Sequence, residues 1–135
     1  MEVEKPSLNH IALVVADLGA ALDFWGGQLG LPSDAAQTIP DEGVEIAFLQ
    51  LGAARLELIQ PLEQDNGVAR YLAKRGPGLH HLCLEVPDLD VKLDELAAQG
   101  IELINDTPRE RDGRRYAFVH PASTGGILLE LYDRN

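Results

Sequence analysis

Residues 8–18 read LNHIALVVADL, and residues 79–89 read LHHLCLEVPDL. The two stretches match at an offset of 71 residues, which aligns His10 with His81 and Asp17 with Asp88. A repeat of this length that occurs only twice does not fit a solenoid. The sequence therefore predicts a duplicated half-domain, with the same order of structural elements in each half.

Each copy of the repeat predicts a strand followed by a helix. The strands, residues 10–15 and 81–86, are rich in Val, Ile and Leu. The two aligned aspartates come next, at positions typical of a helix N-cap. Apolar residues then recur on one helical face until a glycine, Gly30 or Gly100, ends each helix.

Further strands complete each half. We expect them near residues 37–40, 44–51 and 54–59 in the first half, and near 102–105, 116–120 and 126–132 in the second. A short helix is expected over residues 66–74, before a Gly76-Pro77-Gly78 linker. The prediction is an α+β fold of two pseudo-symmetric βαβββ modules, residues 8–60 and 79–133. The helical insert and linker, residues 61–78, would join them into one domain of residues 1–135.

Composition excludes several classes of function. The formal net charge is −11, which argues against binding to nucleic acid or to an anionic membrane surface. It leaves open an anionic small molecule held by a local group of donors. The single cysteine, Cys83, lies in an apolar strand and is expected in the core. No internal disulfide can form, and the acidic N-terminus lacks the apolar segment of a signal peptide, so we expect a cytoplasmic protein.

The repeat places the same ligand chemistry in both halves. Each first strand begins with a histidine, His10 or His81, and each last strand carries a glutamate within an apolar run, Glu57 or Glu130. Such nitrogen and oxygen donors suit divalent metals, but they do not distinguish Co, Mn, Ni, Zn and Mg. Any one of the four is more simply explained as a solvent-facing strand residue. Their recurrence at matched places favours a metal site, although duplication also repeats structural residues.

One carboxylate breaks the symmetry. Glu45 lies in the predicted strand GVEIAF, and its counterpart in the second half is Arg115. A carboxylate without a symmetric partner is a candidate acid or base, and the alternative is a solvent-facing strand position. A cluster of arginines in the second half is either a phosphate-binding group or a solvated hairpin loop. Its members are Arg109, Arg111, Arg114 and Arg115.

Three motifs resemble those of the vicinal oxygen chelate superfamily, which includes glyoxalase I, extradiol dioxygenases and bleomycin-resistance proteins. They are NHIAL with VADL at residues 9–18, PLEQDNGVARYL with GPGLHH at 61–81, and FVHPASTGGILLEL at 118–131. Within that superfamily the chain most resembles the methylmalonyl-CoA epimerases, and the resemblance covers residues 8–132. It departs from their pattern at Ala122, where a lysine is usual, and at Asn66, where a serine is common.

The resemblance implies a glyoxalase-like fold with a metal-binding cleft. It implies four ligands to a divalent metal, and proton transfer by Glu45 and Glu130. The ligands are His10, Glu57, His81 and Glu130. The implied reaction interconverts (R)- and (S)-methylmalonyl-CoA through an enolate, with an acyl-CoA substrate and a homodimeric assembly.

Three alternatives stay open at this point. A glyoxalase I-type lyase would use a similar ligand set but would need a glutathione site. An extradiol dioxygenase would use two histidines and one carboxylate, and Glu57 as a fourth ligand counts against it. A non-catalytic small-molecule-binding member of the same fold would need no metal. His120, which falls in the closing motif, is expected to have a structural role.

Overall fold

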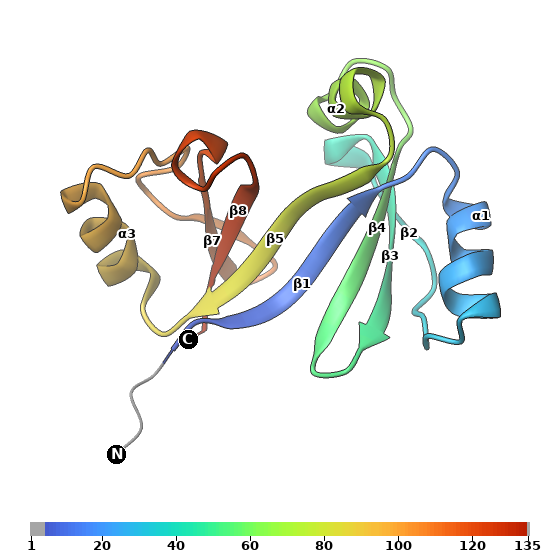
Figure 1. Ribbon diagram of the computed structural model, residues 1–135, viewed down its shortest axis with the longest axis horizontal. Coiled ribbons are helices and arrows are strands. Elements are labelled where there is room, and N and C mark those ends of the chain that lie inside the picture. The colour runs from blue at the N-terminus through green and yellow to red at the C-terminus, as the bar shows by residue number, and fades with distance from the viewer. Residues whose placement is uncertain (1–4, 135) are drawn as a thin grey trace. The chain divides into compact units, whose positions relative to one another are not determined.

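The computed structural model describes residues 5–134, which form eight β-strands and three α-helices and divide into two compact units. The N-terminal unit is residues 10–80, and the C-terminal unit is residues 81–134 with 5–9. The chain therefore passes between the units inside its first strand and again inside its fifth (Figure 1). The predicted α+β class is confirmed. Residues 1–4 and 135, part of the expected domain and of the N-terminus judged free of a signal peptide, lie outside the described residues.

The N-terminal unit follows the predicted βαβββ order. Its strands are β1 (Ser7–Val14), β2 (Gln37–Ile39), β3 (Val44–Leu51) and β4 (Ala54–Pro61). They lie in the order β2-β3-β4-β1, with β1 parallel to β4 and the other neighbours antiparallel. Helix α1 (Leu18–Leu22) continues as π-helical turns over Asp23–Gln28, and α2 (Gly67–Arg75) follows the sheet.

The two faces of this sheet bury different residues. On the face covered by α1, Ala47 and Leu49 of β3 pack with Leu56 and Leu58 of β4 and with Leu18. A smaller cluster on the opposite face contains Ala12, Val44 and Ile59. Because side chains alternate along a strand, odd-numbered residues of β3 point toward α1 and even-numbered residues point away. This parity decides which side chains lie beside the candidate ligands.

The C-terminal unit repeats this arrangement. It consists of β5 (Gly78–Val86, entering from the other unit), α3 (Leu89–Ala98), β6 (Arg109–Arg111), β7 (Arg114–Val119) and β8 (Leu128–Asp133). The strand order is β5-β8-β7-β6, with β5 parallel to β8. A cluster of buried apolar residues packs between the sheet and α3. It contains Val86, Leu89, Leu93, Ala117, Val119 and Leu131.

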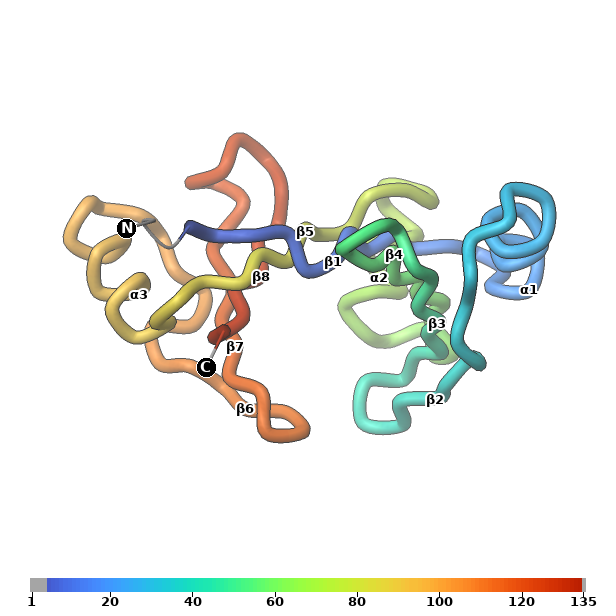
Figure 2. The backbone as a smooth tube through the Cα atoms, turned by 90° about the horizontal axis from the view of Figure 1, so that it is seen from below, coloured from blue at the N-terminus to red at the C-terminus, as the bar shows by residue number. Residues whose placement is uncertain are grey.

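The second half differs from prediction at its first edge strand. The strand expected near residues 102–105 is only an isolated bridge between Leu103 and Val119. The edge strand that pairs with β7 is instead β6, in the arginine-rich segment (Figure 2). Asp112 and Gly113 connect them with φ values of 52° and 77°, as a type I′ hairpin turn requires. The Asp-Gly pair was the sequence signal for this hairpin.

The helix caps agree with prediction. The Asp17 carboxylate accepts a hydrogen bond from the Ala20 amide at 3.0 Å, and the Asp88 carboxylate accepts one from Val91 at 3.2 Å. Cys83 is fully buried, as expected. No helix in the described residues is long and apolar enough to cross a membrane.

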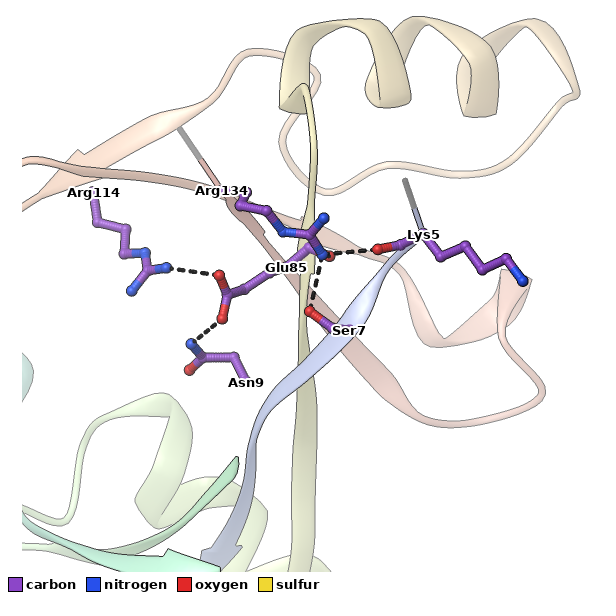
Figure 3. A network of polar contacts seen from close by, with 6 residues as sticks. All are labelled: Lys5, Ser7, Asn9, Glu85, Arg114 and Arg134. Carbon is purple, nitrogen blue, oxygen red and sulfur yellow. Dashed lines mark hydrogen bonds and ion pairs between the residues drawn. The ribbon is translucent and has the colours of Figure 1, made fainter. Parts of the chain in front are cut away.

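A polar network fastens the start of β1 within the C-terminal unit (Figure 3). Arg134 donates hydrogen bonds to the Ser7 hydroxyl at 2.9 Å and to the Lys5 carbonyl at 2.8 Å. The Glu85 carboxylate accepts hydrogen bonds from Asn9 at 3.0 Å and from Arg114 at 3.3 Å. These bonds join four separate segments, residues 5–9, Glu85, Arg114 and Arg134, and they hold the chain where it enters the N-terminal unit.

A second ionic cluster lies on the α3 side of the sheet. The Arg115 guanidinium donates to both oxygens of Asp90, at 2.8 and 2.9 Å, and to Asp133 at 3.1 Å. The hydrogen bonds from Arg115, with its positive charge, hold the pKa of Asp90 below its ordinary value despite desolvation. The same contacts hold the pKa of Arg115 above its ordinary value.

Replacing Arg115 with glutamine is expected to destabilise the protein at pH 7 and to matter less in acid. A depressed carboxyl pKa stabilises the fold above the unfolded-state value of about 3.9, and the effect is lost as the pH falls through the folded-state pKa. Urea unfolding at pH 7 and pH 3 measures the difference between wild type and variant. Arg70→Gln is the control, since its partner Asp65 is fully exposed. An Arg115→Gln effect equal at both pH values would contradict this account.

Candidate metal centre

The N-terminal unit buries a histidine against a carboxylate. His10 is only 1% exposed, on the face of β1 that points away from α1. Its Nε2 lies 3.3 Å from Oε1 of Glu57 on β4. β1 and β4 are parallel neighbours, so the two side chains emerge from adjacent strands on one face. The structure thus joins two of the predicted ligands within this unit.

The C-terminal unit contains the equivalent pair. His81 on β5 and Glu130 on β8 are each 7% exposed, and β5 and β8 are again parallel neighbours. Nε2 of His81 lies 3.2 Å from Oε1 of Glu130. The histidine and glutamate that repeat in the sequence therefore also contact each other in both units.

A phenylalanine completes each pair. Phe48 is the antiparallel partner of Glu57, and its ring meets the His10 ring edge-on at 5.9 Å. Phe118 is the partner of Glu130, and its ring meets His81 edge-on at 6.2 Å. Prediction from sequence did not assign these aromatic residues to the site. The Ala-Phe dipeptide that occurs in both halves, Ala47-Phe48 and Ala117-Phe118, was the available signal.

The donor chemistry of both pairs fits a divalent cation. His10, His81 and Glu130 are buried, and each offers a donor atom of the kind that binds metals. Two ligands of one ion, each about 2.1 Å from it and separated by a tetrahedral or octahedral angle, lie roughly 3.0–3.4 Å apart. The observed nitrogen–oxygen separations of 3.3 and 3.2 Å fall in that range. Each pair could therefore supply two adjacent ligands.

The register of β3 separates Glu45 from these pairs. Glu45 faces Gln60 across the ladder, whereas Phe48 faces Glu57, and the register is continuous between them. Glu45 therefore shares the α1 face with Ala47 and Leu49, and Glu57 points to the other face. Gln60 confirms the orientation, since its side chain accepts a hydrogen bond from the amide of Leu18 at the start of α1. The structure does not bring Glu45 beside His10.

The arginine cluster is engaged inside its own unit. Arg114 pairs with Glu85 and lies over the Tyr132 ring, with 4.6 Å from Cζ to the centroid. Arg115 holds the two aspartates described above, and Arg111 donates a hydrogen bond to the Tyr116 hydroxyl at 3.3 Å. These contacts support a structural role for most of the cluster.

Two other residues singled out by sequence have local roles. The amide of Ala122 donates to Nδ1 of His120 at 2.9 Å, which caps the 3-10 turn Pro121–Ser123. Asn66 accepts a hydrogen bond from the Ala69 amide at 2.7 Å and caps α2, as serine can also do. The structural role expected for His120 agrees with this geometry.

Comparison with known proteins points to one family. Residues 9–118 match the Glyoxalase/Bleomycin resistance protein/Dioxygenase superfamily. Ethylmalonyl-CoA/methylmalonyl-CoA epimerase of Cereibacter sphaeroides is 35% identical over 127 residues, spanning 92% of this chain and 95% of the relative.

Two solved structures are similar as well. Methylmalonyl-CoA epimerase from Mycobacterium tuberculosis superposes with a TM-score of 0.84 at 34% identity, covering 95% of this chain and 87% of that one. Methylmalonyl-CoA epimerase of Streptomyces coelicolor, in complex with 2-nitronate-propionyl-CoA, gives 0.83 at 30% identity, covering 94% and 93%. The resemblance predicted from the three motifs is thereby confirmed.

Proposed function

Since the chain belongs to the glyoxalase/bleomycin resistance protein/dioxygenase superfamily, we propose that it is a methylmalonyl-CoA epimerase. It would interconvert the (R) and (S) epimers by proton transfer at C2 through an enolate. The observation that carries this proposal is the duplicated, buried His–Glu pair, found in a chain whose relatives include epimerases of 2-alkylmalonyl thioesters. The complex of one relative with a nitronate thioester supports the enolate, because a nitronate is also a planar anion.

The proposed metal centre combines the two pairs. His10 and Glu57 from one unit and His81 and Glu130 from the other would hold one divalent cation. When bound, the cation would supply Lewis acidity at the thioester oxygen, where negative charge develops. Burial of the donors supports this role, because electrostatic interactions strengthen where water is excluded.

Aromatic rings and carboxylates of the site also contribute to the proposed reaction. The edge-on Phe48 and Phe118 rings pack against the two imidazoles and help to fix their orientation. A carboxylate beside C2 removes its proton, and a second group returns a proton from the opposite face. Inversion requires two groups, since a single base returns the proton to the side that it left.

Glu130 is our proposal for one of the two groups. For the second, the family resemblance suggests Glu45, whereas the strand register favours Glu57, which shares its sheet face with His10. Metal coordination weakens either carboxylate as a base, so partial release during the reaction is part of the proposal. Assembly as a homodimer, a cytoplasmic location and a role in propionate metabolism are further elements that rest on the resemblance.

One experiment tests the function directly. Purified protein is incubated with a single epimer of methylmalonyl-CoA in D₂O, with and without a chelator, while C2 deuteration and configuration are followed. We expect inversion with deuterium uptake, and loss of both in chelator. A folded, metal-loaded protein with no acceleration over buffer would reject the substrate. Activity toward the methylglyoxal–glutathione adduct would then favour a glyoxalase I-type reaction.

A further inference from the structure

A cation lies on the same sheet face as the N-terminal His–Glu pair. Arg55 precedes Glu57 by two residues on β4, so the two side chains point to one face, about 6–7 Å apart along the strand. Its Cα partner on β1 is His10, one strand spacing away, or about 5 Å. The Arg55 side chain therefore starts within reach of any group bound at that pair.

No carboxylate of the described residues forms an ion pair with this guanidinium. Within residues 5–134, Arg55 takes part in no ion pair or hydrogen bond, and its contact is the Phe48 ring, 3.9 Å from Cζ to the centroid. Arg114 and Arg115, by contrast, both hold carboxylates. In a chain of net charge −11, a half-buried arginine that keeps all five donors available is suited to an external anion.

The duplication does not account for Arg55. In the C-terminal unit the residue two before Glu130 is Leu128, and Leu128 is the Cα partner of His81, just as Arg55 is of His10. The two units thus agree in histidine, glutamate and phenylalanine and differ at this position. An arginine beside only one of the two matched His–Glu pairs is not needed for the fold that both units share, which indicates a separate function for Arg55.

Space for a small group lies beside the guanidinium. A cavity of about 60 Å³ is lined by Arg55, Phe48 and the segments 32–34 and 49–50. Asp34 also lines it, but this side chain is exposed and forms no ion pair with Arg55. A planar carboxylate matches both the size of the cavity and the fork of a guanidinium.

We propose that Arg55 binds the free carboxylate of the acyl group and so selects thioesters of 2-alkylmalonic acids over neutral acyl thioesters. This inference rests on the proposed function, and it names the residue that recognises the charged end of the substrate. The acyl end is the reasonable partner, because the phosphates of coenzyme A are separated from the thioester by the long pantetheine arm. Arg55 starts one strand from the pair that would hold the thioester.

Calorimetric binding to three probes tests the assignment. Methylmalonyl-pantetheine carries the carboxylate without phosphates, coenzyme A carries phosphates without the carboxylate, and methylmalonate is the free acid. Arg55→Gln is expected to weaken methylmalonyl-pantetheine about tenfold to hundredfold and to leave coenzyme A unchanged. Arg55→Lys, which keeps the charge but loses the fork, is expected to lose less. Arg70→Gln, which removes an exposed arginine outside this cavity, is the matched control that should not weaken any probe.

The outcomes separate this inference from the proposed function. Unchanged affinity of Arg55→Gln for methylmalonyl-pantetheine, or a loss confined to coenzyme A, would overturn the inference even in an active epimerase. Arg55-dependent binding of methylmalonate by a protein without epimerase activity would remove the function and leave the anion site. Metal affinity and thermal unfolding are measured on the same samples. Equal losses in Arg55→Gln and Arg55→Lys, accompanied by reduced thermal stability, would assign Arg55 to packing on Phe48 and reject the proposal.

Discussion

Replacing His81 with alanine is expected to lower affinity for a divalent cation by at least about a hundredfold and to abolish measurable epimerisation. Loss of groups that merely orient a ligand already costs about 10–100-fold in metal affinity, and removal of a direct ligand should cost more. His81 is buried against Glu130, so the substitution also leaves a carboxylate without its imidazole partner. Metal titration by calorimetry and the D₂O assay measure the two effects.

The neighbouring histidine provides the control. His80 precedes His81 on β5, so its side chain points to the opposite sheet face, where its ring meets Tyr71 edge-on at 4.9 Å. His80→Ala should therefore bind metal like wild type. Wild-type metal affinity in His81→Ala would reject the metal centre.

His10→Ala extends this test to the other unit. If the two His–Glu pairs share one cation, wild type binds one ion per chain, and either histidine variant loses it. Two ions per chain, each lost in only one variant, would instead mean that each unit holds its own metal. Stoichiometry therefore decides how the duplicated pairs are used, independently of activity.

The duplication made most of the fold and of the ligand set predictable. A repeat that aligns His10 with His81 also aligns their strands, their capping aspartates and the glutamates of their last strands. Contacts within each unit follow from this, because parallel neighbours in equivalent sheets bring equivalent side chains together. Strand β3 was predicted at its observed bounds, since alternation and flanking turns mark it clearly.

Features that depend on strand register or on short edge strands were harder to predict from the sequence. The prediction of a strand near residues 102–105 is wrong, because that segment makes only an isolated bridge to β7. The strand at this edge is β6, which the Asp112-Gly113 turn connects to β7. The facing of Glu45 depends on which β4 residue lies opposite it, and no local pattern in β3 determines that pairing. Arg55 was not assigned to the site from the sequence, because an arginine in a half-buried strand is most simply predicted to face solvent when its neighbours in space are unknown.

Glu130→Gln is expected to lower the rate of inversion by about 10²–10⁴-fold, the usual contribution of a positioned acid or base. The amide keeps the shape of the side chain and one oxygen for a metal, so cation binding should weaken less than in His81→Ala. The diagnostic readout is isotopic. If Glu130 serves one face of C2, its loss leaves the other base able to exchange the proton of a single epimer without inversion. Loss of exchange in both epimers, with metal bound, would show that Glu130 acts only through the metal.

The same assay of isotope exchange and inversion at C2 identifies the second acid or base. Since Glu45 lies on the α1 face of β3, Glu45→Gln is expected to retain inversion within about threefold of wild type, an effect of less than 1 kcal/mol on the barrier. Glu57→Gln, on the face of His10, is expected to lose inversion and to weaken metal binding together. A Glu45→Gln variant that binds metal normally, exchanges one epimer and fails to invert would reverse this assignment. It would mean that the facing of β3 changes when substrate binds, since a one-residue shift of register turns Glu45 to the sheet face of His10.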